Sequence, residues 1–109
     1  FSGRGFTRLT NQIKPDLAAP GVNIMAPAAN GGYQSVTGTS FATPVASGAA
    51  ALLMQWGIVN GNDPFLYGEK VKAYLRRGAK KLPGIAEYPN PLVGYGGLCV
   101  SNSIPKYLV

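Results

Sequence analysis

One serine stands where the chain could place a reactive hydroxyl. Ser40 lies in the segment 38–44 (GTSFATP), between the end of an expected strand and the first turn of an expected helix rich in small residues. At a helix N-terminus, free backbone N–H groups and the positive end of the dipole favour negative charge, as the oxyanion of acyl transfer requires. The N–H of Ser40 could be one donor. Gly38 would let a peptide approach closely, and Ala42 leaves room beneath the hydroxyl.

Spacing alone leaves a second interpretation of this segment open. Serine and threonine are favoured at helix N-caps whatever their function, so Ser40 or Thr39 could simply cap the helix. The segment is not the Gly-x-Ser-x-Gly elbow of another serine hydrolase class, because Ala42 stands where the second glycine would be. The chain has no histidine, and a serine hydroxyl without a base is a poor nucleophile near neutral pH. We therefore expect the 109 residues alone to be inert.

Composition limits the other classes of function. Charged residues make up only 13% of the chain, so much of its surface should be hidden in a large core or against a partner. The net charge of +6 could serve an anionic partner, but a solvated helix face is the simpler origin. We expect no nucleic acid, because no aromatic-basic RNA-binding pattern accompanies the basic residues. Those residues include Lys70, Lys72, Arg76, Arg77, Lys80 and Lys81.

Cysteine and histidine counts restrict disulfides and metal sites. Cys99 is the single cysteine, so no internal disulfide can form. With one cysteine and no histidine, a zinc site would lack ligands, and the residues indicate no metal or cofactor.

The elements expected to position Ser40 are a hairpin before it and a long helix after it. Short strands are expected at 17–19 and 22–25, between Pro and Gly turns. The run 30–32 (NGG) predicts a turn, and 33–37 alternates as a strand does. The uncharged stretch 41–58 reaches the lower edge of a membrane-span signal. Its polar and small residues favour a helix buried in a large core and ending near Gly57, with no membrane contact.

A second helix is predicted from Asp63 as N-cap and Pro64 at the first helical position, running to about Arg77 and ending at Gly78. Its late basic residues complement the helix dipole. Its inward apolar positions are expected to be Phe65, Val71, Tyr74 and Leu75. The chain is then turn-rich from 82 to 97, and 98–100 is expected to be extended.

Three matches, made of four segments, resemble the subtilisin-like serine protease family (subtilases, peptidase S8). The segment 38–52 (GTSFATPVASGAAAL) resembles its nucleophile motif. The segments 1–5 (FSGRG) and 14–24 (KPDLAAPGVNI) resemble the strand and turn that precede the nucleophile, and 94–98 (GYGGL) resembles the closing turn and strand of the catalytic domain. The three matches stand in the family's order and cover nearly the whole chain.

The resemblance implies a fold and a site. The fold would be α/β, with residues 1–109 forming the C-terminal part of a three-layer sandwich with a mostly parallel sheet. Ser40 would be the nucleophile of a serine endopeptidase, and Ser40, Thr39, Gly38 and Phe41 would line the oxyanion site and substrate channel. Phe41 stands where many relatives carry Met, so this site should resist sulfoxide formation. Asp16 would belong to a structural motif and not to the catalytic machinery.

The resemblance also implies partners. The catalytic Asp and His and the oxyanion Asn would come from an N-terminal part of the same protease, and calcium could bind elsewhere in a full-length parent. The substrate would be a protein or peptide. The alternative is a non-catalytic relative, a pseudoprotease acting as a regulatory binding protein. Alone, the chain should expose apolar surface and could self-associate.

The second half of the chain suggests a narrower relationship. The segments 55–68 (QWGIVNGNDPFLYG) and 82–84 (LPG) resemble the clostridial Csp-like branch, which includes proteases acting in spore germination. A secreted, cell-surface or spore-associated location is what this resemblance implies.

Overall fold

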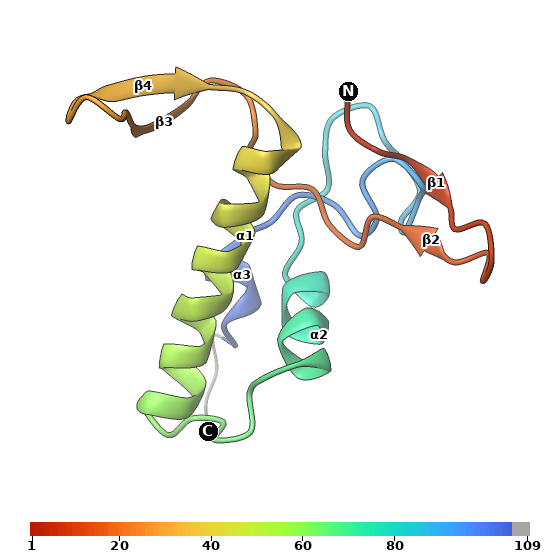
Figure 1. Cartoon of the computed structure of the whole chain (residues 1–109). Coiled ribbons are helices and arrows are strands. Elements are labelled where there is room, and N and C mark those ends of the chain that lie inside the picture. The colour runs from red at the N-terminus through yellow and green to blue at the C-terminus, as the bar shows by residue number, and fades with distance from the viewer. Residues whose placement is uncertain (106–109) are drawn as a thin grey trace.

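Two small antiparallel ribbons precede the helices (Figure 1). The computed structural model describes residues 1–105. In the first ribbon β1 (Gly5–Phe6) pairs with β2 (Ile13–Lys14), and in the second β3 (Ile24–Pro27) pairs with β4 (Tyr33–Val36). Helix and strand together make the chain α/β, as predicted. Within the described residues both ribbons are antiparallel, and the parallel pairing is a single bridge between Ala18 and Gly97.

The hairpin before the helix is confirmed, with its first strand displaced. Ile24 lies opposite Val36, and Gly31, at φ 89°, closes the turn as the glycine run predicts. The strand expected at 22–25 begins at Ile24 because Asn23 has a left-handed φ of 54°. The prediction of a strand at 17–19 is wrong. Among the described residues, this segment has one strand-type pairing, the bridge between Ala18 and Gly97.

The long helix is confirmed, but its end is not where the sequence indicated. Helix α1 (Thr39–Met54) continues into a π-helical turn, η1 (Gln55–Val59), closed by a hydrogen bond from the Asn60 N–H to the Gln55 carbonyl. Gly57 lies inside this turn and is buried. A Cβ on Gly57 would stand 2.7 Å from a methyl of Leu66, so this glycine permits close packing and does not terminate the helix.

The start of the second helix was predicted wrongly. Helix α2 (Glu69–Arg77) begins six residues after Asp63, and Gly68, at φ 58°, precedes it. Asp63 and Pro64 instead begin a turn in which the Leu66 N–H donates to the Asp63 carbonyl. The Asp63 carboxylate accepts hydrogen bonds from the Lys70 ammonium and the Tyr74 hydroxyl, both 2.7 Å away. These bonds lower the pKa of Asp63. They also connect the turn to α2, although Asp63 is not part of that helix.

The C-terminal segment packs back against the helices. Helix α2 ends at Arg77 with Gly78 after it, as predicted, and a Cβ on Gly78 would collide with Ser103. Ser103 belongs to α3 (Val100–Ser103), so the expected extended run 98–100 is wrong at Val100, whereas Cys99 is extended. Helix α3 contacts both α1 and α2 (Figure 1).

The core is small and lies where the three helices meet. Leu53, Leu66, Val71 and Leu75 form it, with Tyr74 packed at its margin. Phe65, expected to face inward, is 70% exposed, and its neighbour Leu66 is fully buried instead. The turn at 63–68 explains the exchange, because it does not follow the helical spacing on which Phe65 was placed.

Helix α1 is covered on one side only. Within its sixteen residues Ala49 and Leu53 are buried, whereas Leu52 is 56% exposed. By length and composition Thr39–Val59 could cross a membrane, a test that the core helix of a soluble protein also passes. The absence of membrane contact therefore stays a prediction.

The chain exposes more surface than a compact monomer of its size. Its accessible area is 7475 Å² for a mass of 11.4 kDa. A folded monomer of this mass exposes about 5,800 Å². Large apolar side chains contribute to the excess, among them Phe1, Leu9, Met25, Tyr33 and Val59. This surface is of the kind that another polypeptide covers.

Candidate functional site

Ser40 is the second residue of α1 and is exposed to solvent. The N-cap position belongs to Gly38, which has no side chain to cap the helix. The interpretation of Thr39 or Ser40 as an N-cap is therefore wrong. Within residues 1–105 the Ser40 hydroxyl makes no hydrogen bond, so it is free to meet a base or a substrate.

The start of α1 has unsatisfied donors beside this hydroxyl. The Phe41 and Ala42 N–H groups both donate to the Gly38 carbonyl, at 3.0 and 3.3 Å. The N–H groups of Thr39 and Ser40 have no acceptor in the described part of the chain. Free N–H groups at the positive end of a sixteen-residue helix can stabilise an oxyanion. Within the described residues the Ser40 N–H is therefore unoccupied, and its role as an oxyanion donor stays a prediction.

Gly38 and Phe41 shape the approach to the hydroxyl. Gly38 has φ 151° and ψ 161°, a region that side chains disfavour. A Cβ there would touch the Phe41 ring at 3.6 Å, so the half-buried ring lies against the glycine. Pro44 has no N–H to donate to the Ser40 carbonyl four residues earlier, so this carbonyl lacks its helical partner.

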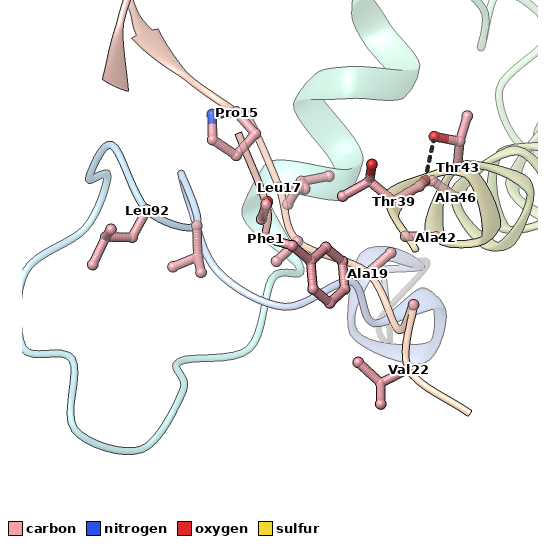
Figure 2. Close-up of a pocket in the computed structure, with 14 residues that line it drawn as sticks. Phe1, Pro15, Leu17, Ala19, Val22, Thr39, Ala42, Thr43, Ala46 and Leu92 are labelled. Atoms are coloured by element: carbon pink, nitrogen blue, oxygen red, sulfur yellow. Dashed lines mark hydrogen bonds between the residues drawn. The ribbon is translucent and has the colours of Figure 1, made fainter. Parts of the chain in front are cut away.

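A cavity of about 370 Å³ opens beside the start of α1 (Figure 2). Thr39, Ala42, Thr43 and Ala46 form its helical wall, because residues at these spacings share one face. The opposite wall includes Leu17 and Ala19. Ser40 is not part of the lining, since consecutive helix residues point about 100° apart. The cavity is therefore next to the hydroxyl, and of the expected site residues only Thr39 lines it.

Two contacts that the sequence reasoning did not predict hold the chain just before α1. The Gly38 N–H donates to the Gly21 carbonyl at 2.7 Å. The Asn23 N–H donates to the Thr37 hydroxyl at 3.0 Å. The Pro20-Gly21 pair marked a turn, but no local signal indicates that this turn contacts residues fourteen to seventeen positions later in the chain.

Asp16 is engaged in a structural cluster, as expected. Its carboxylate lies 2.9 Å from the Arg76 guanidinium, 2.9 Å from the Lys14 ammonium and 3.5 Å from the Lys72 ammonium. Partial burial, the largest single influence, would raise the pKa of Asp16, but the hydrogen bonds and charges of these cations together lower it. With its oxygens occupied, Asp16 is not placed to orient a catalytic base.

The basic residues of 70–81 mostly find partners within the chain. Lys70 and Lys72 pair with carboxylates, and Arg76 pairs with Asp16 and lies over the Tyr95 ring at 5.3 Å. Arg77 and Lys81 lie over Tyr74 and Tyr88 respectively. The carboxylate pairs of Lys70, Lys72 and Arg76 leave less unpaired positive charge for an external anion. Among residues 1–105 no group of three or more His, Cys, Asp or Glu could hold a metal ion.

Comparison with known proteins gives consistent matches. Residues 1–96 match the model of the subtilase family, peptidase S8. The serine protease AprX of Bacillus subtilis is 34% identical over 119 residues, which cover 96% of this chain and 25% of AprX. The solved structure of the CspB protease of Clostridium perfringens matches with a TM-score of 0.87 at 50% identity, over 94% of this chain and 22% of that chain.

A more distant structure agrees over a shorter length. The prenylagaramide maturation protease PagA matches with a TM-score of 0.61 at 36% identity, over 78% of this chain and 30% of that chain. The chain thus spans between about a fifth and a third of the lengths of these relatives.

Proposed function

The chain belongs to the subtilase family, and we propose that it is the part of a subtilase catalytic domain that carries the nucleophile, Ser40. The observation that carries the proposal is the exposed, unbonded Ser40 hydroxyl at the open N-terminus of α1. The relatives named as serine proteases support the same activity. The reaction would be hydrolysis of peptide bonds in a protein or peptide substrate.

The local geometry suits the steps of acyl transfer. The Ser40 hydroxyl oxygen attacks the substrate carbonyl carbon while its proton passes to a base. The carbonyl oxygen becomes an oxyanion, and the free Ser40 N–H would donate to it. Collapse of this intermediate breaks the peptide bond, releases the amine after it takes a proton from the base, and leaves an acyl group on Ser40. Water then hydrolyses the ester. Thr39, Gly38 and Phe41 would shape the channel through which the substrate reaches Ser40.

The base must come from outside these 109 residues, because the chain contains no histidine. We expect a catalytic His and Asp and an oxyanion Asn from a preceding part of the same protease. By itself the chain would be inert. The span of about a quarter of AprX, and the excess surface area, support a larger parent.

The fold of the parent domain is part of the same proposal. Residues 1–109 would complete a three-layer α/β sandwich with a mostly parallel sheet. Residues 106–109 lie outside the described part of the chain. The apolar cavity wall on α1 and the exposed Leu52 are surfaces that such a sheet and its helices would cover. The match to CspB at 50% identity supports placement in the Csp-like branch.

A non-catalytic relative is the alternative, because the chain contains no histidine and the loss of a base elsewhere in the parent would leave this segment unchanged. A regulatory binding protein could keep the same fold without a base. Chemical labelling separates the two functions.

The test is fluorophosphonate labelling of the full-length protein that carries this chain. We expect covalent labelling of the wild type, loss of labelling in Ser40→Ala, and full labelling in Ser47→Ala, which removes an exposed serine further along the same helix. Mass spectrometry of the labelled peptide identifies the modified residue. A folded wild type that takes up no label would overturn the peptidase and leave the non-catalytic relative.

A further inference from the structure

We infer that the turn at residues 20–23 positions the nucleophile, with Gly21 and Thr37 as positioning residues for Ser40. The inference rests on the proposed function of Ser40 and adds to it a pair of contacts outside the 38–44 segment. The two hydrogen bonds that carry it join Gly38 to Gly21 and Thr37 to Asn23. Both bonds meet the chain within three residues of Ser40.

Helix α1 needs such support because it begins without a side-chain cap. At most helix N-termini a Ser, Thr, Asp or Asn side chain fixes the first turn. Here the Gly38 carbonyl accepts from Phe41 and Ala42, and the Gly38 N–H donates to Gly21. The peptide groups on both sides of Gly38 are therefore held by hydrogen bonds. The position of Ser40, two residues later, follows from the position of Gly38.

Gly21 fits against the first turn of α1 because it has no side chain. A Cβ on Gly21 would stand 2.8 Å from the Gly38 carbonyl oxygen and 3.1 Å from the Ala42 Cβ. Figure 2 shows the segment with Ala19 and Val22 passing beside Ala42. The Gly38 carbonyl cannot yield freely, because its oxygen already accepts two helical N–H groups. An alanine at position 21 should therefore shift the helix start by a few tenths of an ångström.

Thr37 fixes the other side of the same turn. Its hydroxyl accepts from the Asn23 N–H, and Asn23 has a left-handed φ of 54° that this bond helps to maintain. Without the hydroxyl, the turn would keep the Gly38–Gly21 bond and the β3–β4 pairing that begins at Ile24 and Val36, but it would lose the bond that lies between them. The backbone between the end of β4 and the start of α1 would then be held less firmly.

The experiment measures the reactivity of Ser40 in the full-length protein. Four variants are compared with the wild type: Gly21→Ala, Thr37→Val, Thr37→Ser and the control Thr10→Val. Thr10 has a hydroxyl bonded to Thr7 in the turn between β1 and β2, away from α1. The measurements are the second-order rate of fluorophosphonate labelling, kcat and KM on a peptide substrate, and the melting temperature.

We expect Gly21→Ala and Thr37→Val to lower the labelling rate and kcat by up to about 10-fold, because a misplacement of about 1 Å can cost about 100-fold and the shift here is smaller. KM should stay within about twofold, since binding of the ground state is not altered. Thr37→Ser keeps the hydroxyl and should restore the rate, and Thr10→Val should match the wild type. A purely structural role would lower the melting temperature without this division between kcat and KM.

Folded Gly21→Ala and Thr37→Val proteins that label at the wild-type rate would overturn the inference while leaving the peptidase intact. If Gly21→Ala does not fold, the comparison of Thr37→Val with Thr37→Ser decides the matter. If the wild type itself is not labelled, the proposed function fails and the positioning role fails with it.

Discussion

At the scale of single residues, Asp16 carries the densest set of interactions. Its carboxylate links Lys14 on its own segment to Lys72 and Arg76 on α2. Its carbonyl accepts the Tyr95 N–H at 2.8 Å, and Arg76 lies over the Tyr95 ring. One acid thus joins three segments that are far apart in the sequence. The cluster is partly exposed, so its ion pairs are weakened by solvent.

Replacing Asp16 by Asn tests this cluster. We expect Asp16→Asn to lower the free energy of unfolding by about 1–2 kcal/mol at pH 7, because Arg76 loses a charged partner and its Nε already lacks an acceptor within the described residues. Chemical unfolding of the full-length protein measures the change. Lys81→Gln, at a cation outside the cluster, serves as the control.

The pH dependence follows from the lowered pKa of Asp16. A carboxyl whose pKa is lower in the folded state adds stability above its unfolded pKa, near 3.8, and loses it as the pH falls through the folded value. The advantage of the wild type over Asp16→Asn should therefore persist from pH 7 to about pH 5 and shrink below about pH 4. A difference that stays constant down to pH 3 would contradict the ion-pair origin.

At the scale of elements, the turn at 63–68 decides which face of the second helix meets the first. Leu66 packs on Gly57 of η1, and α2 then contributes Val71 and Leu75 to the same core. The Asp63 carboxylate fastens the turn to α2 through Lys70 and Tyr74. The turn and the helix therefore dock on α1 as one unit.

Adjacent residues give a matched test of this packing. Leu66→Ala should lower the free energy of unfolding by about 2–4 kcal/mol, because it opens a cavity in the core. Phe65→Ala, at a side chain 70% exposed, should cost less than about 1 kcal/mol. Thermal and chemical unfolding of the two variants measures the contrast. Equal losses would mean that the helical spacing, with Phe65 facing inward, was right after all.

At the scale of the whole molecule, the chain is less compact than a single domain of its length. The radius of gyration is 15.5 Å, whereas a compact domain of about 100 residues has a value near 13 Å. The hairpin β3–β4 extends away from the helices in Figure 1, and its Met25 and Tyr33 are 68% and 76% exposed. The same hairpin leads directly into the helix of Ser40.

The isolated chain should therefore self-associate in solution. We expect residues 1–109, expressed alone, to elute in size-exclusion chromatography as self-associated species, because the exposed apolar surface is covered only by another copy. The isolated chain should also take up no fluorophosphonate at Ser40, since it has no histidine to act as a base. The full-length protein is the control. A well-behaved monomer would contradict the proposed dependence on a larger parent.

Local signals in the sequence determined the elements around Ser40. The glycine run at 30–32 marked the hairpin, the uncharged stretch 41–58 marked α1, and Gly78 marked the end of α2. The subtilase membership was also readable, because the motif around Ser40 is specific and short. These features depend on backbone preferences and spacing over a few residues, which a sequence displays directly.

Contacts between distant segments were decided only by the tertiary structure. Gly57 resembled a helix stop but is a packing site for Leu66, and Asp63 resembled an N-cap but binds Lys70 and Tyr74. The bond from Gly38 to Gly21 likewise joins residues seventeen apart. A glycine or an aspartate has the same local signature in each role. Its contacts depend on which distant segment lies beside it in the folded chain, and that depends on the packing of all the elements together.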